Sequence, residues 1–198
     1  MTAIIDYGVG NLFSLKCSFG AVGAGAEVTG DPEKIRAADR IILPGVGAFG
    51  DAAEKLSERG LDKLVIEEAE RGKPLLGICL GMQLLFDKSF EYGEHMGLGL
   101  IPGEVKPIPA GLKIPHIGWN ALEFNKKTPL FKYIKDGDHA YFVHSYYADC
   151  PDNFVSAYTE YGTRLTASVE SGNVYGCQFH PEKSGDVGLN ILRAFCEL

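Results

Sequence analysis

The chain has 198 residues, of which 45% are hydrophobic and 23% are charged, and its formal net charge is -7. This length and composition indicate a globular protein with one well-buried core, so we expect a single domain over residues 1–198. The negative charge argues against nucleic acid or an anionic membrane as the main partner.

Two further features suggest where the protein works. The segment Met1–Asp6 lacks the basic start of a signal peptide, and no apolar run is long enough to span a membrane. The five cysteines are scattered without Cys-x-x-Cys spacing, which favours a reducing cytosol over a disulfide framework. His139 and His144 lie near Cys150 without a recognised ligand spacing, so no metal site is expected. We therefore expect a cytoplasmic protein.

Strand-like and helix-like segments alternate in the first part of the chain. The pattern predicts strands at Thr2–Asp6, Glu27–Thr29, Asp39–Leu43 and Pro74–Cys79. It predicts helices at Leu12–Ala24 and across 51–71. Glycine-rich turns follow two of the strands, at Tyr7–Asn11 and Pro44–Gly50. This alternation indicates an α/β fold with a mainly parallel sheet, in which ligands bind beyond the carboxyl ends of the strands.

The second part of the chain has a different character. It contains β-like segments joined by short turns, at Ile101–Pro109, Tyr141–Ala148, Phe154–Thr159, Leu165–Ser171 and Asn173–Phe179. These segments predict antiparallel strands added to the parallel sheet. Gly185–Leu198 closes the chain as a predicted amphipathic helix.

A candidate nucleophile stands at the end of the strand predicted at Pro74–Cys79. Cys79 is flanked by Gly77 and Gly81 in a Gly-x-Cys-x-Gly pattern, with a helix-like run directly after it. This is the layout of a nucleophile elbow, whose tight turn requires small residues two positions either side of the nucleophile. A lone cysteine between glycines can also be a small core residue, so the motif needs partners elsewhere in the chain.

The sequence Gly176-Cys177-Gln178-Phe179-His180-Pro181-Glu182 supplies such partners. A cysteine nucleophile needs a base, and the base needs an orienting group. His180 and Glu182 are two positions apart, so their side chains leave the same face of an extended segment. Together with Cys79 they predict a Cys-His-Glu triad, because triads assemble in space rather than in sequence.

The elbow around Cys79 and the His-Pro-Glu motif together resemble the triad-type (class I) glutamine amidotransferases. Other motifs resemble the branch of this family that serves imidazole glycerol phosphate synthase, and the likeness covers essentially the whole chain. These motifs are Asp6–Leu12, Pro44–Gly50, Pro115–Asn120 and His144–Tyr146. The resemblance implies a flavodoxin-like three-layer sandwich, with a mainly parallel sheet extended by antiparallel strands.

The resemblance also implies roles for individual residues. Cys79, His180 and Glu182 match the catalytic triad. The backbone N–H groups of Val46 and Leu80 match the oxyanion hole. The positions that match substrate-binding residues are Gly47, Gln83, Glu91, His144, Ser145 and Tyr146, with Glu94 an alternative to Glu91. The positions that match the synthase interface are Asn11, Trp119, Asn120 and Lys183.

By the same resemblance, the chain hydrolyses L-glutamine without a cofactor or metal. It forms a heterodimer with a cyclase and delivers ammonia to it, for the synthesis of imidazole glycerol phosphate and AICAR in histidine biosynthesis. The glycines at 45 and 47 let the oxyanion-hole peptides reorient at low cost. We therefore expect a poor glutaminase in isolation, completed by the ligand-loaded cyclase.

Three alternatives remain at this stage. The chain could be the glutaminase of another amidotransferase, of the pyridoxal phosphate or anthranilate type, although these should lack the paired Asp6–Leu12 and Gly118–Asn120 motifs. A cysteine peptidase on the same scaffold is the second alternative. A non-catalytic module is the third, and the intact triad argues against it.

Overall fold

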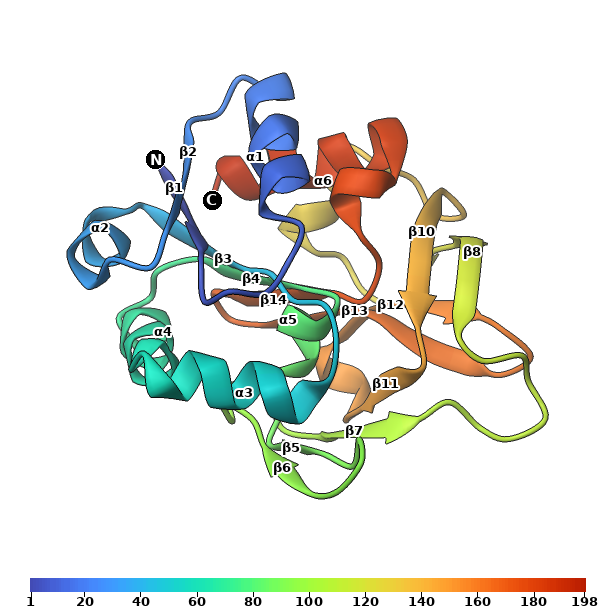
Figure 1. Cartoon of the computed structure of the whole chain (residues 1–198). Helices are drawn as coiled ribbons and strands as arrows, with labels where there is room; N and C mark the ends of the chain where they lie inside the picture. Colours follow the sequence, from blue (N-terminus) through green and yellow to red (C-terminus); the bar gives the residue numbers. More distant parts are fainter.

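The computed structural model describes residues 1–198 and is built around a sheet of eight strands (Figure 1). Five neighbouring strands are parallel: β2 (Ala26–Thr29), β1 (Thr2–Ile5), β3 (Arg40–Leu43), β4 (Leu75–Ile78) and β14 (Val174–Cys177). Three antiparallel strands extend the sheet beyond β14: β13 (Arg164–Ser171), β12 (Val155–Glu160) and β9 (Glu123–Phe124). The predicted parallel sheet with an antiparallel extension is therefore confirmed.

Helices cover both faces of this sheet, which gives three layers (Figure 1). One face carries α1 (Leu12–Ala21) and α6 (Gly185–Cys196). The other carries α2 (Pro32–Ala37), α3 (Phe49–Glu58) and α4 (Leu61–Glu70). None of the helices has both the length and the apolar character that a membrane crossing requires.

The layers follow from side-chain alternation along buried strands. In β1, Ala3 and Ile5 face a core shared with α2, α3 and α4, whereas Ile4 faces a second core shared with α1 and α6. All three side chains are fully buried. A strand buried on both faces has no solvent-facing positions, which explains the continuous apolar runs in the first half of the sequence.

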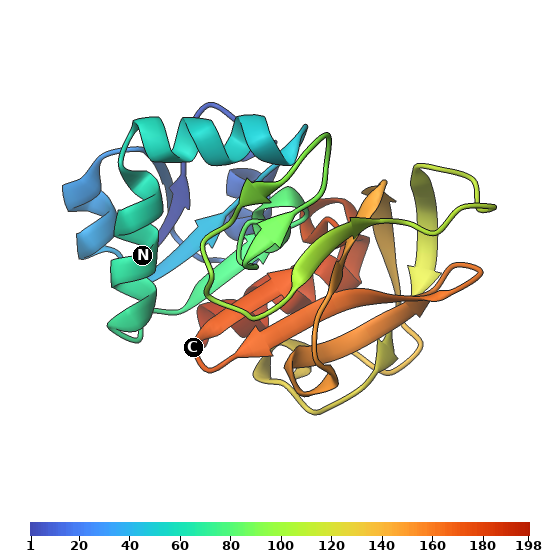
Figure 2. The ribbon, with the colours of Figure 1, turned by 90° about the horizontal axis from the view of Figure 1, so that it is seen from below.

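Two smaller sheets lie beside the main one (Figure 2). A ribbon pairs β8 (His116–Ala121) with β10 (His139–His144). A four-stranded sheet joins β11 (Tyr146–Asp149), β7 (Glu104–Pro107), β5 (Lys88–Ser89) and β6 (His95–Met96). Short 3₁₀ turns occur at η1 (Pro129–Phe131), η2 (Asp152–Phe154) and η3 (Pro181–Lys183).

The structure corrects several predicted elements in the second half. The strand predicted at Tyr141–Ala148 breaks at Ser145, because β10 pairs with β8 whereas β11 pairs with β7. The segment Ile101–Pro109 also joins the small sheet instead of extending the main one. Asn173–Phe179 contributes β14, which is parallel to β4 and antiparallel to β13.

The helix boundaries also differ from the prediction. The first helix ends at Ala21 instead of Ala24, because Val22 caps it and Gly23 takes a positive φ of 75°. The short helix α2 was not predicted, although Asp31 caps it through Glu33 N and Pro32 occupies its first turn.

Candidate active site

Cys79 occupies the turn between β4 and α5 (Leu80–Gln83). Its backbone has φ 54° and ψ -111°, a conformation that costs energy for a residue with a side chain. The glycines predicted around it are sterically required. A Cβ on Gly81 would collide with the carbonyl oxygen of Leu43, and one on Gly77 would lie 2.6 Å from the Gly81 oxygen. The sequence therefore builds the predicted elbow at Cys79.

The register of two adjacent parallel strands brings the rest of the predicted triad to Cys79. In β4 and β14, Ile78 pairs with Cys177, and the Cys79 N–H donates to the Cys177 carbonyl at 2.7 Å. The chain then continues three residues beyond β14 to His180, whose N–H donates to the Tyr141 carbonyl at 3.0 Å. Both residues thus lie just beyond the carboxyl ends of neighbouring strands.

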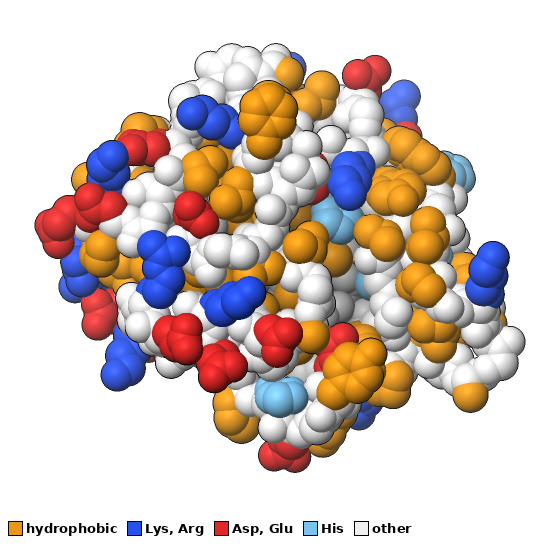
Figure 3. All heavy atoms as spheres, in the orientation of Figure 1, with side chains coloured by type: hydrophobic (Ala, Val, Ile, Leu, Met, Phe, Trp, Pro, Cys, Tyr) orange, Lys and Arg blue, Asp and Glu red, His pale blue; other side chains and the backbone are white.

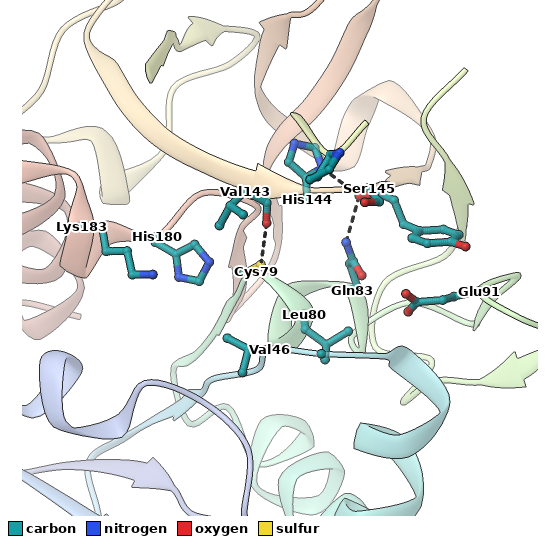
Figure 4. Close-up of a pocket in the computed structure, with 13 residues that line it drawn as sticks. Val46, Cys79, Leu80, Gln83, Glu91, Val143, His144, Ser145, His180 and Lys183 are labelled. Atoms are coloured by element: carbon teal, nitrogen blue, oxygen red, sulfur yellow. Dashed lines mark hydrogen bonds between the residues drawn. The ribbon is translucent and has the colours of Figure 1, made fainter. Parts of the chain in front are cut away.

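His180 and Glu182 form a buried pair. The imidazole Nδ1 lies 2.8 Å from Glu182 Oε1, and the two side chains are 3% and 2% exposed. Burial lowers the pKa of His180, but hydrogen bonding and charge from Cys79 and Glu182 outweigh it and raise the pKa to about 9. Because Glu182 occupies Nδ1, Nε2 is the nitrogen left for proton exchange with Cys79, beside which the ring lies in Figure 4.

Two other groups contact the sulfur. Cys79 Sγ lies 4.0 Å from the Val143 carbonyl oxygen, which accepts from the thiol (Figure 4). On another side, the amide Nε2 of Gln178 donates to Sγ at 3.8 Å. The sulfur of Cys79 is therefore held between an acceptor on β10 and a donor from the segment that follows β14.

The sulfur faces a cavity of about 310 Å³. Most of the residues expected at the triad, the oxyanion hole and the substrate site line it, together with Pro115, Val143 and Lys183. Its volume is in the range of small-ligand sites. Figure 4 shows Cys79 and His180 on one side of this space and Gln83 and Glu91 on the other.

Gln83 and Glu91, both expected at the substrate, line the cavity with partly engaged side chains. Gln83 Nε2 donates to the Tyr146 carbonyl and to Gln178 Oε1, each at 3.0 Å, so only its Oε1 remains to meet a ligand. Glu91 Oε2 accepts from the Phe49 N–H at 2.6 Å. The alternative Glu94 is exposed and lies 3.6 Å from Lys88 Nζ, outside the cavity lining.

His144 lines the cavity as a neutral ring. Burial, reinforced by His116 and His180, lowers its pKa to about 4, although the hydrogen bond to the Tyr146 carbonyl acts in the opposite direction. Its Nδ1 donates to that carbonyl at 2.8 Å, and Nε2 lies 3.0 Å from His116 Nδ1. Ser145 and Tyr146 follow it in the lining, at the break between β10 and β11.

The expected oxyanion side is formed by the loop after β3. Gly45 packs directly on the elbow, since a Cβ there would lie 2.7 Å from Gly81 N. The Tyr7 hydroxyl donates to the Pro44 carbonyl at 2.7 Å and fixes the start of the loop. Further along, Val46 is 43% exposed, and no backbone hydrogen bond uses its N–H or that of Gly47. Leu80 begins α5, so its N–H has no helical partner.

The four expected partner residues lie in different surroundings. Lys183 lines the cavity, with Nζ 6.0 Å from the centre of the Tyr141 ring. Trp119 on β8 is 54% exposed and meets the same ring edge-on. Asn120 is engaged within the chain, with His116 and the Glu160 carbonyl, and Asn11 caps α1 through Ser14 N.

Apolar side chains surround the hollow at the carboxyl ends of the strands, as Figure 3 shows. Exposed large hydrophobic residues on α1, on the loop after β3 and on β8 include Phe13, Val46, Ile117 and Trp119. Such a clustering of exposed apolar groups on one face is typical of a protein-binding surface.

The sequence motifs did not indicate roles for Gln178 or Tyr7. Gln178 lies two positions before His180, and Tyr7 lies directly after Asp6. Side chains alternate between the two faces of an extended segment, so Gln178 and His180 lie on the same face. This alternation is the pattern that could have pointed to Gln178. Nothing in the sequence indicated that the Tyr7 hydroxyl reaches Pro44.

Comparisons with known proteins agree on one family. Residues 3–197 match the family model "Glutamine amidotransferase class-I". The chain is 51% identical to "Imidazole glycerol phosphate synthase subunit HisH" of Bacillus cereus (strain G9842), an alignment that covers 98% of this chain and 93% of the relative. It is 52% identical to the protein of the same name from Lactococcus lactis subsp. lactis, with 98% and 96% covered.

Solved structures show the same fold. "Crystal structure of glutamine amidotransferase" superposes with a TM-score of 0.78 at 22% identity and covers 98% of this chain and 97% of that one. "Structure of PurLQS from Thermotoga maritima" gives a TM-score of 0.76 at 23% identity, with 99% and 97% covered. The fold class predicted from the sequence is confirmed.

Proposed function

The chain belongs to the class I glutamine amidotransferase family, and we propose that it hydrolyses L-glutamine and supplies the ammonia to a cyclase subunit. The observation that carries this proposal is that Cys79 and His180 line one cavity, with Glu182 bound to the imidazole nitrogen on the other side of the His180 ring. The β4–β14 register brings the first two together, and a 2.8 Å contact joins the last two. These are the parts that amide hydrolysis through a thioester requires.

In the first half of the reaction, the Cys79 thiolate attacks the side-chain amide carbon of glutamine. The carbonyl π electrons move to the oxygen, where the N–H groups of Leu80 and of the Val46–Gly47 loop stabilise the oxyanion. When this intermediate collapses, the C–N bond breaks, and His180 Nε2 gives the proton that it took from the Cys79 thiol to the departing amide nitrogen, which leaves as ammonia. A thioester between Cys79 and the glutamyl group remains.

In the second half, neutral His180 takes a proton from water as the water oxygen attacks the thioester. The second oxyanion collapses, the C–S bond breaks and glutamate leaves. Glu182 accepts from Nδ1–H of His180 throughout, which keeps Nε2 directed at the reacting atoms and stabilises the imidazolium.

The rest of the cavity suits the amino-acid end of glutamine. The free Oε1 of Gln83 is an acceptor and Glu91 carries negative charge, so both complement the α-ammonium group. Gly47, His144, Ser145 and Tyr146 complete the walls, with His144 neutral at physiological pH because its pKa is about 4. The geometry favours binding of a free amino acid with its side-chain amide at Cys79.

The partner is the cyclase of imidazole glycerol phosphate synthase, which makes imidazole glycerol phosphate and AICAR in histidine biosynthesis. Identities of about 50% over nearly full length to proteins named as a subunit of that synthase support this choice over the pyridoxal phosphate and anthranilate types. The cyclase binds the face that carries the exposed apolar residues Phe13 and Trp119 and the expected partner residue Lys183. It also completes the oxyanion hole at Val46.

Glutamine hydrolysis by the purified chain is the direct test, with the cyclase absent, present, and loaded with its ligand. Stoichiometric glutamate and ammonia are expected, with no cleavage of peptide substrates. Peptide cleavage without glutamine hydrolysis would replace the proposal with the peptidase alternative.

A further inference from the structure

Gln178 is a fully buried polar side chain that the reaction scheme leaves unused. Its neighbours Cys177 and Phe179 belong to the core shared with α1 and α6. Since successive side chains in an extended segment point to opposite faces, Gln178 points with His180 to the face that carries the active site. An apolar side chain would fill this buried position at a lower desolvation cost, so the buried amide of Gln178 indicates a specific role.

The hydrogen bonds around Gln178 determine which way its amide is oriented. The series begins at the Tyr146 carbonyl, which can only accept, so the Gln83 atom 3.0 Å away is Nε2. The same nitrogen lies 3.0 Å from the Gln178 amide, so the Gln178 atom facing it is Oε1. The remaining end of the Gln178 amide, Nε2, therefore faces Cys79 Sγ at 3.8 Å.

This orientation matters for the charge on the sulfur. The Val143 carbonyl, 4.0 Å from Sγ, accepts from a thiol S–H but repels a thiolate. The Gln178 N–H donor has the opposite preference, because hydrogen bonds to an ionised acceptor are stronger than bonds to a neutral one. The two groups compete for the protonation state of Cys79.

We propose that Gln178 is a positioning residue that holds Cys79 as an oriented thiolate, with its own amide oriented by Gln83 and the Tyr146 carbonyl. This inference rests on the proposed role of Cys79 as nucleophile. It adds a second donor to the sulfur besides His180, and it links the sulfur to the wall that receives the substrate through the two glutamine side chains.

The test is the pH profile of Cys79 alkylation by iodoacetamide in the full-length chain, followed by mass spectrometry of the five cysteines. The variant Gln178→Met removes the donor at nearly constant volume. Loss of a hydrogen bond to a charged group should slow alkylation of Cys79 at pH 7 by about tenfold to a hundredfold. The midpoint of the profile should move up by about one to two pH units, and kcat with glutamine should fall with it.

Two further variants separate this role from a structural one. Ser168→Ala removes another buried hydrogen bond, to the Gly176 carbonyl, and should leave the alkylation profile unchanged. Gln83→Met removes the group that orients the Gln178 amide, and it should slow alkylation in the same direction by less. Gln83→Met also provides the test if Gln178→Met does not fold.

The outcomes distinguish the two proposals. Selective alkylation of Cys79 in the unmodified chain with an unchanged profile in both glutamine variants would overturn the role of Gln178 and leave the nucleophile standing. Indiscriminate alkylation in the unmodified chain would overturn the nucleophile itself. Equal shifts in Ser168→Ala and Gln178→Met would indicate a structural role only.

Discussion

The two walls of the candidate active site are built by different means. The triad wall comes from the ends of β4 and β14, where strand register, buried side chains and the β4–α5 turn determine each position. The oxyanion wall comes from a loop whose Val46 is exposed and whose Val46 and Gly47 N–H groups make no backbone hydrogen bond. From this comparison we expect a constant nucleophile beside a donor loop that a partner can adjust.

The largest expected effect is the loss of the nucleophile. Cys79→Ala should reduce glutamine turnover by at least about ten-thousandfold, because triad members act as a unit. The fold should persist, since only one sulfur is removed from the elbow. A steady-state glutaminase assay of the complex, with circular dichroism of the variant, measures both. A glutamine-analogue alkylator should label Cys79 alone, and labelling spread over Cys17 or Cys150 would contradict the assignment.

The next effect concerns the orienting carboxylate. Glu182→Gln should lower kcat by about a hundredfold to ten-thousandfold with little change in KM, because Nδ1 loses its charged acceptor while the cavity is retained. His180→Asn should be more severe, since it removes both base and acid. A wild-type rate in Glu182→Gln would show that another group orients the imidazole.

The same variant has a defined pH signature. Glu182 is one of the groups that raise the pKa of His180 to about 9, so Glu182→Gln should lower that pKa and shift the alkaline limb of the rate profile to lower pH. A raised folded-state pKa stabilises the fold fully below the unfolded value of about 6.5, and this stabilisation is lost as pH rises through about 9. The loss of stability caused by Glu182→Gln should therefore decrease as the pH rises from about 6.5 to about 9. Denaturation of the variant and the unmodified chain at several pH values would show this.

A smaller effect is expected on the partner face. Trp119→Ala should weaken cyclase binding by about tenfold, as expected for an aromatic interface anchor, with little change in stability because the ring is half exposed. Met96→Ala removes an exposed side chain on β6 and serves as the control. Calorimetric titration with the cyclase gives the affinities. Equal affinities for the two variants would place the interface elsewhere.

The smallest expected effect distinguishes two roles of Asn11, as the cap of α1 and as a contact with the cyclase. Asn11→Ala should cost about 1 kcal/mol of stability or less, because its bond to Ser14 N is long at 3.4 Å. Asp31→Ala removes the cap of α2, whose bond to Glu33 N is 2.9 Å, and it should cost at least as much. Only Asn11→Ala should also weaken cyclase binding. If neither variant affects binding, Asn11 is a cap alone.

The sequence predicted the parts of this molecule that local rules determine. Gly77 and Gly81 specified the elbow because steric limits in a tight turn are local, and alternation between strand and helix specified the parallel sheet. The break at Ser145 was not predictable, because both halves of Tyr141–Ala148 have β-like composition and only tertiary pairing assigns them to different sheets. The contact of Gln178 with the sulfur likewise depends on register between distant strands.

The central claim, a preformed triad beside an adjustable oxyanion loop, is tested most directly by comparing the rates of two reactions of Cys79, alkylation and glutamine hydrolysis. Alkylation by iodoacetamide needs the thiolate but no oxyanion hole, whereas glutamine hydrolysis needs both. Both rates would be measured for the chain alone, with empty cyclase and with ligand-loaded cyclase. We expect loaded cyclase to raise glutamine hydrolysis by about a hundredfold to a thousandfold, the effect of one oxyanion donor, while the alkylation rate stays nearly constant. Equal hydrolysis rates in all three states, or alkylation that rises in parallel with hydrolysis, would contradict the claim.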